Sequence, residues 1–181
     1  MNILVAPDKF KGSLTAVQVC EAIETGIKRH DPDAVVMMHP LADGGEGTLD
    51  VLDAAMQLET EYLVVNDPLF RPIKAFYKRN RDTAFIEMAV ASGLEILETD
   101  ERNCLNTSTL GTGELMLHAI SNGISTIYLF IGGSATNDGG MGLARQVKDE
   151  ISNCPPTFRT VIFDPIIDLA SIRSNSPEGC R

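Results

Sequence analysis

Short apolar runs alternate with amphipathic segments along most of the chain. The apolar runs are typical of buried β-strands, and they lie at residues 1–6, 34–38, 61–65, 74–77, 84–88 and 127–131. Residues 80–82 are polar and fall between two of these runs, so they predict a turn that pairs the two strands.

The amphipathic segments predict three helices. Thr15 and Gln18 have the spacing of a capping box, and Val19, Ile23 and Ile27 recur at every fourth position after it. This pattern predicts an amphipathic helix of roughly 14 residues. Two further helices are expected, one at 48–56 and one at 112–121 with Gly123 as its C-terminal cap.

Alternation of strands and helices favours an α/β fold with a partly to largely parallel sheet and flanking helices. The length of 181 residues suits one domain, or one domain with part of another. Residues after 145 have a different pattern: a helix through 146–154 that Pro155 and Pro156 stop, a strand at 161–163, and a polar end at 171–181.

Charge and composition exclude several classes of protein. The formal net charge is −10 and no Lys/Arg cluster exists, which argues against nucleic acid or an anionic membrane as a partner. No run of about 18 apolar residues is present to span a bilayer. The N-terminus lacks a signal-peptide pattern, so we expect a cytoplasmic location. The four cysteines are far apart and are expected to be reduced.

Two loops near the N-terminus carry candidate chemistry. The first loop, at 7–13, precedes a helix N-terminus and therefore suits an anion, although its lysines also fit a solvated loop. The second loop, at 41–48, combines glycines, which let a ligand approach the backbone, with carboxylates for a metal ion or for proton abstraction. The candidate residues are Asp8, Lys9, Lys11 and Ser13 in the first loop, and Asp43, Gly44, Gly45, Glu46, Gly47 and Thr48 in the second.

Two later loops add hydroxyl groups and glycines. The segment 107–114 is rich in hydroxyl groups and opens a helix, where Thr112 is also interpretable as an N-cap. The segment 131–142 follows the most apolar strand, and its glycines can form a nest of backbone N–H groups around phosphate oxygens. Its candidate residues are Gly132, Gly133, Ser134, Asn137, Asp138 and Gly139, with Asp138 and Asn137 as oxygen ligands for Mg²⁺.

Standard nucleotide and hydrolase motifs are absent from the sequence. It contains no Walker-type G-x-x-x-x-G-K-[ST], no G-x-G-x-x-G after the first strand, and no G-x-S-x-G elbow. The residues alone therefore predict an α/β protein with an anion-binding, Mg²⁺-assisted site.

The loops nevertheless resemble a known family. Five blocks occur in order: Ala6–Leu14, Ala42–Thr48, Glu87–Leu94, Thr109–Leu115 and Ile131–Gly140. Together they resemble the bacterial ATP-dependent glycerate kinases that form 2-phosphoglycerate. The resemblance covers residues 1 to about 145 and implies parts of two interleaved α/β domains.

The resemblance implies transfer of the γ-phosphoryl group of ATP to D-glycerate with Mg²⁺. Lys9 and Lys11 would bind the glycerate carboxylate or phosphate oxygens, and Asp43 would accept the proton of the attacking hydroxyl. Glu46 or Asp138 would hold Mg²⁺, and the backbone of Gly132–Ser134 would cradle phosphates. We expect Asp43, Lys11 and Asp138 to be the catalytic residues.

One departure from the family leaves an alternative open. Its members are considerably longer, and residues 146–181 do not resemble their continuation, so we interpret this stretch as an atypical tail. The alternative interpretation is therefore a catalytically inactive glycerate kinase remnant or an anion-binding module. An incomplete sheet of this kind is expected to expose apolar strand edges and to self-associate.

Overall fold

The computed structural model describes residues 1–153 and 159–163. These residues form two compact units. The first unit comprises Met1–Asp43 and Gly47–Leu58, and the second comprises Gly44–Glu46 and the chain from Glu59 onward. The expectations for Pro155 and Pro156, for the polar end at 171–181 and for Cys154 and Cys180 lie outside the described residues.

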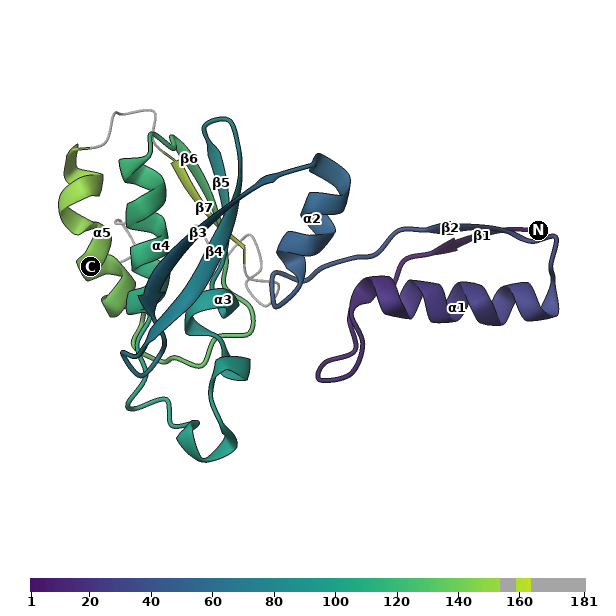
Figure 1. Cartoon of the computed structure of the whole chain (residues 1–181), viewed down its shortest axis with the longest axis horizontal. Helices are drawn as coiled ribbons and strands as arrows, with labels where there is room; N and C mark the ends of the chain where they lie inside the picture. Colours follow the sequence, from purple (N-terminus) through teal and green to yellow (C-terminus); the bar gives the residue numbers. More distant parts are fainter. Residues whose placement is uncertain (154–158, 164–181) are drawn as a thin grey trace, which may run out of the picture. The chain divides into compact units, whose positions relative to one another are not determined.

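The first unit contains two strands and two helices. β1 (Asn2–Val5) and β2 (Val35–Met38) pair in parallel, with Asn2 opposite Val35, and α1 (Ala16–His30) connects them and runs alongside the pair (Figure 1). α2 (Thr48–Met56) has the predicted bounds. A parallel pair needs a crossover connection, and a helix is the usual solution.

The start of α1 confirms the predicted capping box. The Thr15 hydroxyl accepts a hydrogen bond from the Gln18 amide at 3.2 Å, and the Gln18 side chain accepts one from the Thr15 amide at 2.9 Å. The first part of the predicted apolar stripe is buried, with Val19 and Cys20 in the core. Further along the helix, however, Ile23 is 39% exposed.

The second unit is built on a mixed five-stranded sheet with the order β3-β4-β5-β6-β7. The strands are β3 (Glu59–Asn66), β4 (Pro72–Asn80), β5 (Thr83–Glu87), β6 (Thr126–Phe130) and β7 (Arg159–Phe163). β3, β4 and β5 are antiparallel, whereas β5, β6 and β7 are parallel. The structure thus confirms the α/β class with a partly parallel sheet. The predicted turn joins β4 to β5 and places Arg81 at a φ of 54°.

Short helical segments and two longer helices complete the second unit. They are α3 (Ala89–Ser92), η1 (Leu94–Ile96), η2 (Thr99–Glu101), α4 (Leu110–Ser121) and α5 (Met141–Asn153). α4 and α5 lie side by side (Figure 1). A Cβ atom on Gly113 of α4 would lie 2.8 Å from the Leu143 Cα atom of α5, so this close packing requires glycine.

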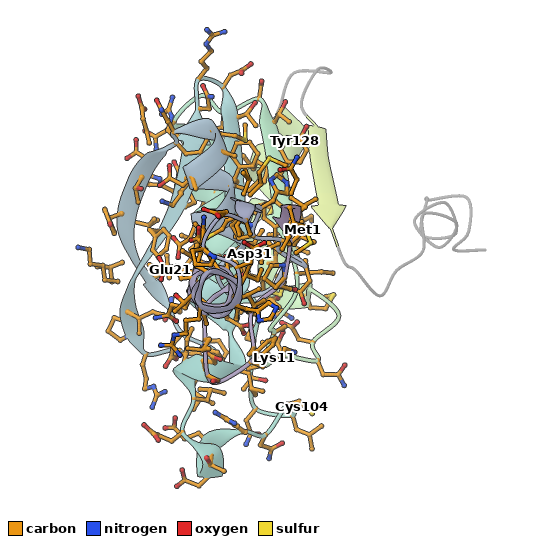
Figure 2. All side chains as sticks on the ribbon, turned by 90° about the vertical axis from the view of Figure 1, so that its right-hand side faces the viewer. Met1, Lys11, Glu21, Asp31, Cys104 and Tyr128 are labelled. Atoms are coloured by element: carbon orange, nitrogen blue, oxygen red, sulfur yellow. The ribbon has the colours of Figure 1, made fainter. Side chains whose placement is uncertain are left out.

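Two details of these elements differ from expectation or extend it. α4 begins two residues before the predicted start, with Thr109 as its N-cap, so the interpretation of Thr112 as an N-cap is wrong. Thr112 is instead fully buried inside the helix and its hydroxyl lies 2.7 Å from that of Ser92. Of the described cysteines, Cys20 is buried and Cys104 is exposed, and both are free thiols (Figure 2 labels Cys104).

Within the described part of the chain, no helix combines the length and the apolar character needed to cross a bilayer. The core of the second unit is apolar and lies between the sheet and the α4–α5 pair. Its fully buried members include Tyr77, Ile86, Leu115 and Ile127.

Candidate functional site

The glycine-rich loop at 131–142 connects β6 to α5 in the second unit. Gly133, Gly139 and Gly140 have φ angles of 73°, 61° and 76°. These angles belong to the left-handed region, which is unfavourable for residues other than glycine. The glycines that the sequence marked as a phosphate nest are therefore needed for the path of the backbone.

Asp138 organises the second half of this loop. Its carboxylate accepts hydrogen bonds from the Thr109 amide at 2.9 Å and from the Gly140 and Gly142 amides at 3.0 and 3.1 Å. The hydroxyl groups of Thr109 and Ser108 also donate to it, at 2.9 and 3.2 Å. The carboxylate thus ties the start of α4 to the start of α5.

These donors determine the ionisation of Asp138. Burial opposes the charged form, but the hydrogen bonds from the Thr109 amide and hydroxyl and from the Gly142 and Gly140 amides outweigh burial. The pKa of the carboxyl group is consequently below its usual value. A carboxylate offers about four lone-pair directions. Because five donors converge on its two oxygens, little capacity is left for a metal ion.

The first half of the loop is fixed against the segment that follows β5. The Gly133 carbonyl accepts a hydrogen bond from the Leu94 amide at 2.8 Å, and the Ala135 amide donates to the Ser92 carbonyl at 2.9 Å. The Thr107 hydroxyl donates to the Ala135 carbonyl at 2.9 Å. The loop is therefore a fixed structure with contacts to two separate segments of the chain.

The second glycine-rich segment meets this loop inside the same unit. The Gly132 amide donates to the Gly44 carbonyl at 2.9 Å. A Cβ atom on Gly132 would lie 2.6 Å from the Gly45 nitrogen, and one on Gly133 would collide with the Glu46 carboxylate. Gly44, Gly45 and Glu46 therefore lie directly against Gly132 and Gly133, as only glycine allows.

Asp43 and the predicted residues of the loop at 7–13 lie in the first unit. The Lys9 ammonium group is 4.0 Å from a carboxylate oxygen of Asp43, and the Asp8 carboxylate accepts a hydrogen bond from the Lys9 amide at 2.6 Å. Lys11 and Ser13 are exposed in the turn around Gly12 (Figure 2 labels Lys11). The structure therefore brings Lys9 and Asp43 together.

Two further predicted residues, Gly47 and Thr48, lie at the start of α2. Gly47 is the N-cap of α2 with a φ of 87°, and Thr48 is buried at the first helical position. No side chain caps this helix.

Several residues of the site were missing from the predicted set. Ser108 and Thr109 hold Asp138, and Ser92 and Leu94 hold the loop. The hydroxyl-rich pattern of residues 107–114 was visible in the sequence. The residue that these hydroxyl groups bind was not, because Asp138 follows Thr109 by 29 positions.

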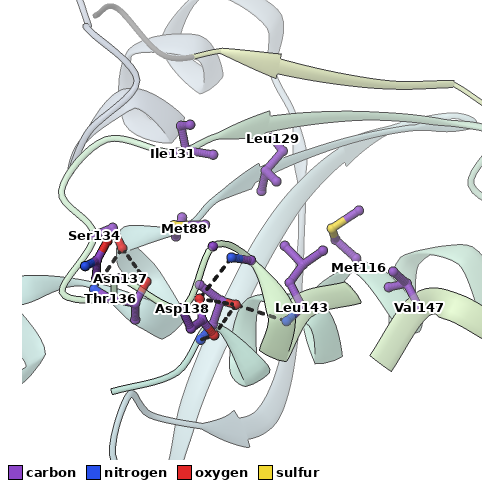
Figure 3. Close-up of a pocket in the computed structure, with 13 residues that line it drawn as sticks. Met88, Met116, Leu129, Ile131, Ser134, Thr136, Asn137, Asp138, Leu143 and Val147 are labelled. Atoms are coloured by element: carbon purple, nitrogen blue, oxygen red, sulfur yellow. Dashed lines mark hydrogen bonds between the residues drawn. The ribbon is translucent and has the colours of Figure 1, made fainter. Parts of the chain in front are cut away.

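A cavity of about 600 Å³ opens beside the glycine-rich loop. Its lining consists of apolar side chains and the polar residues Thr109, Ser134, Thr136, Asn137 and Asp138. Figure 3 shows Ser134, Thr136 and Asn137 away from Met116, Leu143 and Val147. The described residues contain no group of three or more His, Cys, Asp or Glu side chains that could hold a metal ion. A metal at this site would therefore depend on few protein ligands.

Comparison with known proteins adds a family relationship to this geometry. The model of the glycerate kinase family matches residues 3–153. A glycerate kinase from Halalkalibacterium halodurans is 48% identical over 148 residues, which are 81% of this chain and 39% of that protein. The glycerate 2-kinase of Escherichia coli K12 is 46% identical over 149 residues, with the same two coverages.

Two further relatives extend the comparison. A glycerate kinase from Neisseria meningitidis serogroup B is 38% identical over 180 residues, which are 97% of this chain and 47% of that protein. A crystal structure from Salmonella typhimurium LT2 that carries a glycerate kinase 2 assignment superposes with a TM-score of 0.63. It is 45% identical and covers 81% of this chain and 40% of that one. The chain thus spans roughly two fifths to one half of the length of these relatives.

Proposed function

Because the chain belongs to the glycerate kinase family, we propose that it phosphorylates D-glycerate to 2-phosphoglycerate with Mg²⁺-ATP. The bond that forms joins a hydroxyl oxygen of glycerate to the γ-phosphorus. The bond that breaks joins this phosphorus to the bridging oxygen of ADP, and the hydroxyl proton passes to a protein carboxylate. Such a reaction depends mainly on positioning and on charge neutralisation.

One observation carries the proposal: two separate glycine-rich family blocks meet in the second unit. The hydrogen bond from the Gly132 amide to the Gly44 carbonyl and the fit of Glu46 against Gly133 bring them together. A backbone without side chains lets phosphate oxygens approach amide groups closely. We assign the backbone of Gly132, Gly133 and Ser134, together with Gly139, to phosphate binding.

We assign the carboxylate chemistry of the first unit to Asp43. Its side chain is 42% exposed, so a substrate hydroxyl has access to it. Lys9, at 4.0 Å, adds a positive charge that favours an anionic substrate. Lys11 is exposed and supplies a second cation for the glycerate carboxylate or for phosphate oxygens.

The contacts of Asp138 support a positioning role for it. Its five donors do not fit a metal ligand, so of Glu46 and Asp138, the two carboxylates predicted to hold Mg²⁺, we retain Glu46. Mg²⁺ commonly binds one or two carboxylates together with substrate phosphates. When bound, Mg²⁺ would neutralise charge on the phosphates. We propose that glycerate and ATP are the partners of the chain, and that it acts in the cytoplasm.

The test is an assay of the purified, folded chain for phosphoglycerate formed from D-glycerate and Mg²⁺-ATP. We expect turnover that Asp43→Asn reduces at least about a hundredfold, because proton transfer by a positioned group contributes 10²–10⁴-fold. Asp33→Asn is the matched control, since Asp33 is an exposed carboxylate of the same unit.

Two outcomes would contradict the proposal or its assignment. A folded, monodisperse chain without turnover would favour the alternative of an inactive remnant or anion-binding module. Turnover that Asp43→Asn leaves unchanged would remove Asp43 as the proton acceptor while retaining the activity.

A further inference from the structure

We propose that the cavity beside the glycine-rich loop binds the nucleoside part of ATP, its adenine and ribose. The inference rests on the proposed function, because it assigns a place to the phosphoryl donor of that reaction. The volume of about 600 Å³ lies within the usual range of small-molecule sites, 300–1,000 Å³.

The walls of the cavity are apolar and come from both layers of the second unit. Leu129 lies near the end of β6 and Ile131 directly follows this strand, whereas Met116 lies on α4 and Leu143 on α5 (Figure 3). Met88 and Val147 also line the cavity. A purine has two apolar faces, and the flexible thioether of a methionine packs well against such rings.

Polar groups gather at the other end of the cavity. The Ser134 and Thr136 hydroxyl groups lie 2.8 Å apart, and the exposed Asn137 follows them. A site with mostly apolar walls and a few polar groups at one end is typical of cofactor and nucleotide binding. Glycerate has three carbons, two hydroxyl groups and a carboxylate, so it cannot use the apolar walls.

The position of the loop fixes the direction of the nucleotide. Gly139 and Gly140 line the polar end, and Asp138 holds them through the Gly140 amide at 3.0 Å. A nucleoside in the apolar part would therefore extend its phosphates toward these glycines. None of the described residues that line the cavity is a lysine or arginine, which suits an uncharged base and ribose better than a phosphate.

The seven methionines provide a direct test. Met88 and Met116 line the cavity, whereas Met37 and Met38 lie on β2 of the first unit. We would label the methionine methyl groups with carbon-13 in the full chain and assign their NMR signals by single Met→Leu variants. Titration with ADP, and separately with adenosine, should shift the signals of Met88 and Met116 and leave those of Met37 and Met38 in place.

Two other probes separate the parts of the nucleotide. D-glycerate and inorganic pyrophosphate should leave the Met88 and Met116 signals unchanged, because neither molecule has a group for the apolar walls. ADP that binds without moving these two signals would overturn the proposal. Absence of any ADP or adenosine binding to the folded chain would also overturn it.

A blocking substitution gives a second readout. Leu143→Trp would place an indole in the cavity and should weaken ADP binding at least tenfold. Tyr62→Trp is the matched control, because Tyr62 is 60% exposed on β3 and does not line the cavity. Unchanged ADP affinity in a folded Leu143→Trp variant would overturn the proposal. If that variant does not fold, the methionine titration of the unsubstituted chain decides.

The proposed function has a separate readout. If the chain phosphorylates glycerate but ADP does not shift the Met88 and Met116 signals, the proposed kinase activity stands and only the cavity assignment is overturned. ADP-dependent shifts at both methionines without phosphorylation would retain the nucleoside site and contradict the kinase activity.

Discussion

The Asp138 carboxylate accepts hydrogen bonds from both the amide and the hydroxyl of Thr109, each at 2.9 Å. The same Thr109 hydroxyl accepts a hydrogen bond from the Leu143 amide at 3.0 Å. The two residues therefore satisfy free N–H groups at the starts of α4 and α5 simultaneously. The hydrogen bonds of Asp138 and Thr109 therefore determine the conformation of the glycine-rich loop together with its glycines.

Replacing Asp138 by Asn should lower the free energy of unfolding by about 2–3 kcal/mol, because the NH₂ group of Asn would replace one acceptor oxygen and would face N–H donors from which it cannot accept a hydrogen bond. Urea unfolding followed by circular dichroism measures the change. Asp33→Asn should change stability by less than about 0.5 kcal/mol, as expected for an exposed position. Equal effects of the two substitutions would contradict the role of Asp138.

The lowered pKa of Asp138 also sets a pH dependence. A carboxyl group with a lower pKa in the folded state stabilises that state above the unfolded pKa, about 3.9. This contribution is lost as the pH falls below about 4 and through the lower folded pKa. The stability difference between the unsubstituted chain and Asp138→Asn should therefore shrink below about pH 4. A difference that stays constant down to pH 2 would refute the linkage.

Gly132→Ala should destabilise the second unit by about 2 kcal/mol, within the usual cost of inserting a carbon into tight packing. Its Cβ atom would lie 2.6 Å from the Gly45 nitrogen, which belongs to the backbone and cannot rotate away. Gly139→Ala is the matched control, because its φ is 61° but nothing lies within 4 Å of the added atom. The control should cost only the backbone strain, about 1 kcal/mol. Thermal unfolding of both variants makes the comparison.

Phe70 occupies the left-handed region at a φ of 65°, and its ring is 57% exposed. Phe70→Gly should therefore be about 1 kcal/mol more stable than Phe70→Ala, because both remove the ring but only Ala keeps the Cβ clash. Chemical denaturation of the pair measures this difference. If Ala proves as stable as Gly, the turn has a different backbone conformation.

Lys11→Met should raise the KM for glycerate about tenfold with little change in kcat, because it removes one charged contact with the substrate. Steady-state kinetics on the full chain provides both constants. Lys148→Met is the control, since Lys148 is an exposed lysine on α5 of the second unit. Unaltered saturation by glycerate would remove Lys11 from substrate binding.

The sequence predicted correctly those features that depend on residues close together in the chain. The capping box of Thr15 and Gln18 and the bounds of α2 were both predicted correctly. α3 was missed, because the four residues from Ala89 to Ser92 are too few to show a helical period. The antiparallel half of the sheet depends on the pairing of β3 with β4, which no period within one strand reveals.

In the candidate site, too, features set by neighbouring residues were predicted, whereas contacts between distant residues were not. The glycines at 132, 133 and 139 were identified because their chemistry is local. The contact between Gly132 and Gly44 spans 88 positions, and the donors of Asp138 come from both sides of it in the chain. A sequence pattern gives residue types but no such distances, so it marked Asp138 as a candidate without indicating what holds it.

The attachment of the glycine-rich loop to Ser92, Leu94 and Thr107 has a consequence for amide-proton exchange with solvent. The amides of Leu94, Ala135 and Leu143 are donors in bonds that join segments far apart in sequence. They can open to solvent only when those segments separate, and such openings need most of the cooperative unfolding energy. Their protons should exchange at nearly the rate of those in β6, and a synthetic peptide of residues 131–142 should show no such protection.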